Sequence, residues 1–101
     1  MTDFYDNSVE PLGEAGVARQ LTAGSASANT ALSTSVRRIS IRAVGADIRF
    51  SIGTGTQTAN GNTSHYIANG ERLDFAIPKN ANIGVIRDGT VNGTLELTEL
   101  N

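Results

Sequence analysis

Apolar and polar side chains alternate along several stretches of this chain, which is the pattern of β-strands that bury one face. The longest such stretch is residues 35–53, SVRRISIRAVGADIRFSIG. Near its middle, Gly45-Ala46 suits a two-residue type II′ turn, so the stretch predicts a β-hairpin. Its cross-strand partners would be Ile39 with Ile52, Ile41 with Phe50, Ala43 with Ile48 and, on the polar face, Arg42 with Arg49.

Two more strand pairs are expected further along the chain. Asn69-Gly70 is typical of a type I′ turn, so residues 64–77 predict a second hairpin. In this hairpin Tyr66 would lie opposite Leu73 on the inward face. Residues 82–87 and 94–100 also alternate and predict a third pair, joined by the turn-forming residues 88–93. The inward-facing positions form the expected core: Ile41, Phe50, Leu73, Phe75, Ile83, Val85, Leu95 and Leu97.

The remaining segments are poorer in bulky apolar residues. A short strand is possible at 19–23, whereas the Ser- and Thr-rich segment 25–33 favours a loop, and 54–63 is expected to be a mobile surface loop. Short strands at this spacing indicate an all-β fold, a small antiparallel β-sandwich or barrel with an extended N-terminal arm.

The predicted domain boundary follows a change in composition near residue 18. Residues 1–18 contain Asp3, Asp6, Glu10 and Glu14 and no basic residue, so they are interpreted as an acidic arm, and residues 19–101 as the β domain. The arm is either a disordered terminus or a segment that becomes ordered on a neighbouring subunit. In the second case Phe4 and Tyr5 would be its anchors.

Composition narrows the possible functions. The chain has 101 residues, a formal net charge of −2, no cysteine and no tryptophan. The lack of cysteine excludes disulfides and thiolate chemistry, and the near-neutral charge gives no reason to expect a nucleic acid or a membrane as partner. A chain of this size supports one modest core and would gain stability from association with copies of itself.

Two patterns could suggest chemistry, and neither is convincing. His65 would face Asp74 across the second hairpin, but no nucleophile accompanies them. Residues 88–99 partly match a calcium-binding EF-hand loop, with Thr90 in place of an acidic or amide ligand, yet both flanks look like strands rather than helices. We therefore expect a protein that is not an enzyme, with no catalytic residue, cofactor or metal.

The arginines are the most distinctive polar feature. Like charges directly opposite one another in a sheet are destabilising, so Arg42 and Arg49 would need acidic neighbours. These neighbours are either carboxylates of the same chain or the acidic surface of a partner. The candidate interface residues are Phe4, Tyr5, Arg38, Arg42 and Arg49.

Residues 35–100 resemble small virion structural proteins of tailed bacteriophages, of the capsid decoration or cement type. The similarity lies in VRRISI (36–41), DIRFSIG (47–53), ANGERLDF (68–75), NIGVIR (82–87) and GTLELT (93–98). The resemblance implies a non-catalytic β-sandwich that binds the major capsid protein at capsomer boundaries, in many copies per virion, after synthesis in the host cytoplasm. The alternative is a carbohydrate-binding β module of the tail, the neck or a receptor-facing position.

Overall fold

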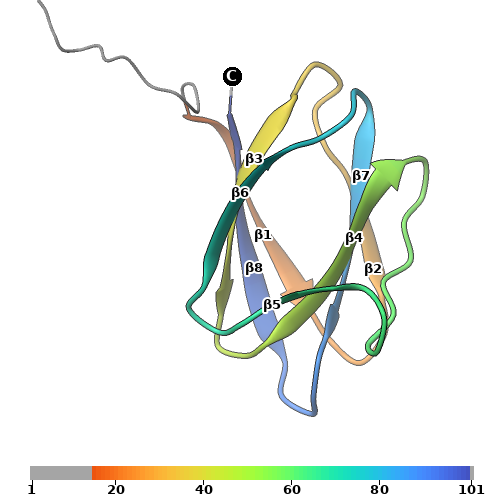
Figure 1. Ribbon diagram of the computed structural model, residues 1–101, viewed down its shortest axis with the longest axis vertical. Helices are drawn as coiled ribbons and strands as arrows, with labels where there is room; N and C mark the ends of the chain where they lie inside the picture. The colour runs from red at the N-terminus through yellow and green to blue at the C-terminus, as the bar shows by residue number, and fades with distance from the viewer. Residues whose placement is uncertain (1–14, 101) are drawn as a thin grey trace, which may run out of the picture.

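The structure, a computed structural model, describes residues 15–100, and these residues form β-strands without a helix. The strands are β1 (Ala15–Ala23), β2 (Ala28–Ala31), β3 (Arg38–Val44), β4 (Ile48–Thr54), β5 (His65–Ile67), β6 (Arg72–Ala76), β7 (Ala81–Arg87) and β8 (Gly93–Leu100). They make two antiparallel four-stranded sheets with the orders β1-β8-β3-β6 and β2-β7-β4-β5. The two sheets face each other as layers (Figure 1), which confirms the predicted β-sandwich.

The strand order is that of a jelly roll. Counted from the two ends of the eight-stranded chain inward, β1 pairs with β8, β2 with β7, β3 with β6 and β4 with β5. A jelly roll has eight strands in two sheets and is found in viral capsid and lectin domains, among others. In this arrangement every connection except that from β4 to β5 crosses from one sheet to the other.

This topology shows that the three predicted hairpins are wrong. Ile41 pairs with Leu73 of β6 and Leu97 of β8, whereas Phe50 pairs with His65 of β5 and Val85 of β7. The alternation predicted correctly which side chains of β3 and β4 point inward. It could not show that these strands face each other from opposite sheets instead of sharing a ladder of hydrogen bonds.

The turn residues that suggested hairpins instead tie two connections together at one end of the sandwich. Asn69 accepts a hydrogen bond from the Gly45 N–H through its side-chain oxygen (2.9 Å) and donates its own N–H to the Asp47 carboxylate (2.7 Å). At Asn69-Gly70 only the glycine has positive φ (88°), and the Glu71 N–H donates to the Ala68 carbonyl. This is the geometry of a type II turn rather than the predicted type I′ turn.

Most of the predicted core is confirmed. Six of its residues are buried: Ile41, Phe50, Ile83, Val85, Leu95 and Leu97. The exceptions are Leu73 and Phe75, which are only half-buried. They lie on β6, an edge strand, so one side of each has no neighbouring strand of the same sheet.

The faces of the short strand β5 are the reverse of those expected. Ile67 is fully buried, whereas Tyr66, which was expected to point inward, is 43% exposed. His65 pairs with Phe50 rather than with Asp74, which lies opposite Ser40 in the other sheet. The expected His65–Asp74 pair is therefore wrong, because it depended on the hairpin that does not form.

The N-terminal part of the β domain is more extensive than expected. β1 begins at Ala15, so residues 15–18 belong to the sandwich rather than to the arm. β2 lies within the segment 25–33 that was expected to be a loop, because β7 supplies a partner strand for its backbone groups. The first fourteen residues, including Phe4 and Tyr5, lie outside the described residues.

The connection from β4 to β5 is held against the sandwich, whereas residues 54–63 were expected to form a mobile surface loop. Ala59 is buried, and its N–H donates to the Ser27 hydroxyl (2.8 Å). The loop backbone passes so close to β7 that a Cβ on Gly84 would lie 2.7 Å from the Gln57 carbonyl oxygen. Gly84 is therefore needed to let the loop lie on the sheet.

A buried carboxylate closes the sandwich at the end where β8 finishes. Glu99 is 1% exposed and receives hydrogen bonds from the Arg19 guanidinium of β1 (3.1 Å) and the Ser33 N–H (2.9 Å). Burial raises the pKa of Glu99, but the bonds from Ser33 and Arg19 outweigh this effect and hold its pKa below the ordinary value. Through these hydrogen bonds Glu99 joins β8 to β1 and to the connection between β2 and β3.

Candidate functional site

An apolar hollow lies on the side of the sandwich where β5 and β6 are the edges of opposite sheets. On the other side, β1 contacts both β2 and β7 of the facing sheet. The hollow between β5 and β6 has a volume of about 310 Å³ and is lined by Phe50, His65, Tyr66, Leu73 and Phe75. We call it the aromatic groove. Its volume is near the lower limit of ordinary ligand pockets.

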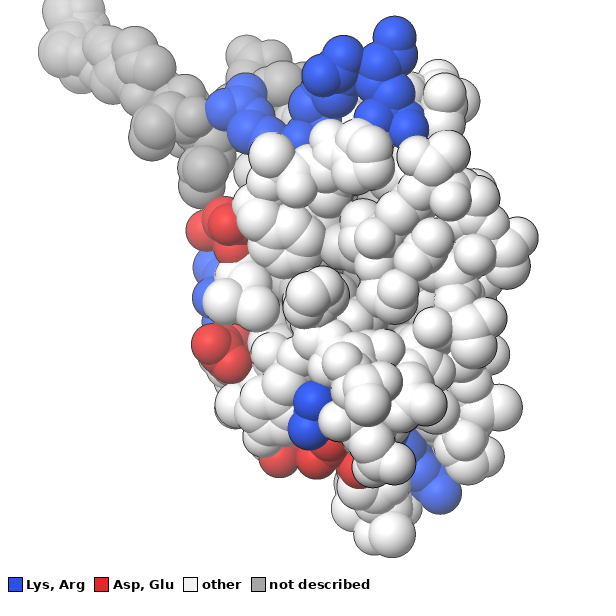
Figure 2. Space-filling view, turned by 45° about the vertical axis from the view of Figure 1, so that its right-hand side comes forward, with Lys and Arg blue, Asp and Glu red and all other residues white. Residues whose placement is uncertain are grey.

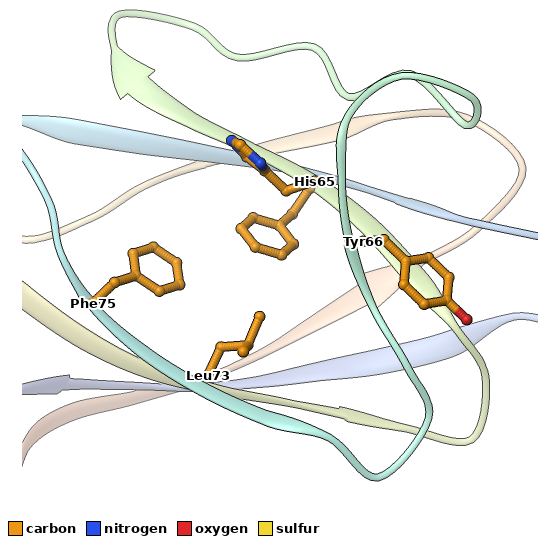
Figure 3. A pocket seen from close by; sticks show the side chains of 5 residues that line it. His65, Tyr66, Leu73 and Phe75 are labelled. Atoms are coloured by element: carbon orange, nitrogen blue, oxygen red, sulfur yellow. The ribbon is translucent and has the colours of Figure 1, made fainter.

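Each wall of the aromatic groove comes from a different sheet (Figure 3). Leu73 and Phe75 approach from β6, at alternate positions of the strand, and His65 approaches from β5. Phe50 of β4 is buried between them, with ring centroids 5.4 Å from His65 and 5.9 Å from Phe75. These separations are within the range of favourable ring contacts.

Tyr66 forms one end of the groove and is 43% exposed. Its ring lies 5.0 Å below the Arg49 guanidinium, and its hydroxyl bonds to the Asp47 carboxylate. This hydrogen bond is the main cause of the raised pKa of Tyr66. The pKa of Asp47 is lowered, first by the Asn69 N–H and then by Tyr66. Arg49 at the ring face and Asp47 at the hydroxyl together fix the orientation of the Tyr66 ring.

The partners of the Arg49 side chain are Asp88 and Ser64, and Arg42 is not its neighbour. The Arg49 guanidinium forms a 2.8 Å ion pair with Asp88 and donates to the Ser64 carbonyl (2.9 Å). The expected pairing of Arg42 with Arg49 is wrong, because the two residues lie in different sheets. These two members of the predicted interface do not form one surface.

Arg42 has a different like-charged neighbour. It lies opposite Arg72 on β6 and opposite Glu96 on β8, and Arg72 donates to the Ser40 hydroxyl (2.8 Å). The acidic neighbour that the sequence required is thus present on an adjacent strand. The sequence pattern did not single out Glu96, because about half of the chain lies between β3 and β8.

A second group of cations gathers at the end of the sandwich where β6 finishes, as Figure 2 shows. Arg38 lies opposite Ala76, and the Arg37 carbonyl accepts from the Ile77 N–H. The following turn carries Lys79, and both Arg37 and Lys79 are exposed. We call Arg37, Arg38 and Lys79 the cationic end; of these, the sequence prediction included only Arg38. Ala76, the residue opposite Arg38, directly follows Phe75 of the aromatic groove.

The calcium-loop pattern at 88–99 is spread over the length of β8. Asp88 precedes the strand and is paired with Arg49, whereas Glu99 lies near its far end and is paired with Arg19. Within residues 15–100 no group of three or more His, Asp or Glu side chains is placed to hold a metal ion. In the same part of the chain no helix is long and apolar enough to cross a membrane.

Comparison with known proteins gives no match to this chain, whether with protein-family models, with curated proteins or with solved structures.

Proposed function

We propose that this protein is a virion structural protein of a tailed phage, which decorates and stabilises the capsid shell by binding at capsomer boundaries without chemistry. The proposal rests first on the resemblance of residues 35–100 to such proteins. The jelly-roll sandwich is compatible with it, since this architecture occurs in viral capsid domains. It is equally compatible with lectin-like binding, so the fold alone does not decide the function.

The observation that carries the proposal is the cationic end. Arg38 and exposed Arg37 lie on a backbone segment that is hydrogen-bonded to the segment carrying exposed Lys79, at the end of the sandwich where cations gather in Figure 2. A cluster of this kind favours an acidic protein surface, which it attracts over about 8–10 Å at physiological salt. The cationic end thus replaces the predicted Arg42 and Arg49 surface as the place of attachment.

Binding to particles stripped of the protein tests this proposal. We expect the full chain to co-sediment with such particles in hundreds of copies, and Arg37→Glu with Lys79→Glu to weaken binding strongly, more so at low salt. The matched control is Arg42→Glu, an exposed arginine on the outer face of β3, which should bind nearly as wild type. Saturation at a handful of copies would contradict a shell location.

The second candidate is a carbohydrate-binding module, and the exposed ring of Tyr66 favours it. Sugar rings stack on exposed aromatic faces, and Tyr66 stands beside a groove that also contains Phe50 and Phe75. This function predicts glycan binding that is lost in Tyr66→Ala and kept in Val44→Ala, which changes a residue of equal exposure on another face. A glycan array with both variants distinguishes the two functions.

A further inference from the structure

The aromatic groove lies open between two edge strands, each of which lacks a neighbouring strand on its outer side. β5 ends one sheet and β6 ends the other. Edge strands with exposed backbone groups are places where an extended segment of another chain can be added. An occupant of this groove would need an aromatic or apolar side chain for the hollow and an extended backbone beside it.

The charges beside the groove restrict the occupant further. Ala76, the residue after Phe75, lies opposite Arg38, so a segment that places a ring in the groove lies within a few residues of the cationic end. Acidic residues next to the aromatic side chain would be attracted there. The partner that fits is therefore an extended, acidic segment with an aromatic residue.

Residues 1–14 of the same protein have this chemistry. Phe4 and Tyr5 are flanked by Asp3 and Asp6, and no basic residue occurs before Arg19. All eight Lys and Arg residues of the chain lie beyond this segment, whereas four of its ten acidic residues lie within it. The segment and the β domain therefore carry opposite net charges, and copies of the protein attract each other in this pairing.

The segment begins at the edge of the sheet opposite to the edge that borders the groove. The segment joins the β domain at Ala15, on β1, and β1 is the edge of its sheet farthest from β6, with β8 and β3 between them. Tyr5 precedes Ala15 by ten positions, and an extended chain of this length spans about 33–36 Å. This is enough to reach the groove of an adjacent molecule.

We infer that the Phe4-Tyr5 segment of one copy docks in the aromatic groove between β5 and β6 of the next copy, with its acidic residues beside the cationic end. Since successive side chains of an extended segment point to opposite sides, one of the two rings enters the groove. The contact is head-to-tail and links copies into a ring or a row. It goes beyond attachment to a shell, because it concerns contact between copies.

Photo-crosslinking in a mixture of isotopically distinct copies tests this docking. The full chain is prepared with a benzoylphenylalanine in place of Tyr5, mixed with an equal amount of heavy-isotope-labelled wild type, and irradiated. We expect crosslinks to β5 and β6 peptides of the heavy copy. Crosslinks confined to the light copy would overturn docking between copies, and crosslinks to other strands would overturn the groove as the site.

Self-association of the full chain gives an independent measurement. Phe4→Ala with Tyr5→Ala should weaken association in sedimentation equilibrium at least tenfold, whereas Val9→Ala, which removes an apolar side chain elsewhere in the segment, should change it less than twofold. Leu73→Glu should weaken association as well, by placing a negative charge in the groove. Equal association of all variants with wild type would overturn the inference, whether or not the protein binds capsid shells.

Discussion

Phe50 and Phe75 stack across the open side of the sandwich, from strands of different sheets, with their ring planes inclined by 13°. Phe50 is 3% exposed and Phe75 is half-buried, so one ring belongs to the core and the other to the groove. The contact connects the stability of the core to the shape of the groove.

The two rings should therefore respond differently to truncation. Phe50→Ala removes a buried aromatic side chain and should destabilise the fold by about 3–5 kcal/mol. Phe75→Ala should cost less, because water already reaches part of its ring. Chemical denaturation of both variants measures the difference. Equal losses of stability would show that the groove is as closed as the core.

Gly84 is expected to tolerate no side chain. Gly84→Ala places a Cβ against the Gln57 backbone, so the loop must move away from β7, and we expect a loss of about 1–3 kcal/mol. Gly89→Ala is the matched control, since a Cβ there meets no atom within 4 Å and the residue does not have positive φ. Thermal unfolding of the two variants should separate them clearly.

The ion pair between buried Glu99 and Arg19 makes the stability of the fold depend on pH in the acidic range. Because the pKa of Glu99 is lower in the folded state than in the unfolded state, its contribution is complete above the ordinary glutamate pKa of about 4.3 and is lost as the pH falls through the folded-state value. Asp47, whose pKa is also lowered, acts in the same direction.

Glu99→Gln isolates this contribution. It should destabilise the protein at pH 7 by about 1–3 kcal/mol, through the loss of charged hydrogen bonds. It should also flatten the decline in stability below pH 5 relative to wild type, as measured by urea unfolding at several pH values. An unchanged decline would assign the acid sensitivity to other carboxylates.

The contact between Tyr66 and Asp47 should be visible in titrations. Tyr66 is expected to ionise above its ordinary pKa, and Asp47→Asn should move its pKa down towards that value, because the accepting carboxylate and its charge are both removed. NMR of the tyrosine ring resonances measures this. A pKa that does not move in Asp47→Asn would show that the hydroxyl has another partner in solution.

The sequence predicted which face of a strand is buried better than it predicted which strands pair with each other. Ile41 and Phe50 were assigned correctly to the interior because a buried face leaves a period-two pattern wherever the strand pairs. Their actual neighbours come from strands remote in sequence, and no local pattern records such pairings. Tyr66 was misassigned because β5 has only three residues, too few for a period to be recognised.

The aromatic groove could not be predicted for the same reason. It exists because β5 and β6 are edges of different sheets, although Asn69-Gly70 between them is typical of a hairpin. The sequence indicated only two bulky apolar side chains, Leu73 and Phe75, on one strand. That this strand has no neighbour on one side follows from the strand order. The cationic end depended likewise on the adjacency of Arg37 and Ile77, which the strand order creates.

The pairing of β1 with β8 has a consequence for how the protein is made. The residues of β1 leave the ribosome early, but their partner residues 93–100 are synthesised several seconds later, at about 5–20 residues per second. Folding also requires contacts distant in sequence, which places the protein among slow folders, in the range of about milliseconds to seconds. The β domain is therefore completed only after its last strand has been translated, and surfaces built by the finished sandwich, such as the aromatic groove, are not available on the nascent chain.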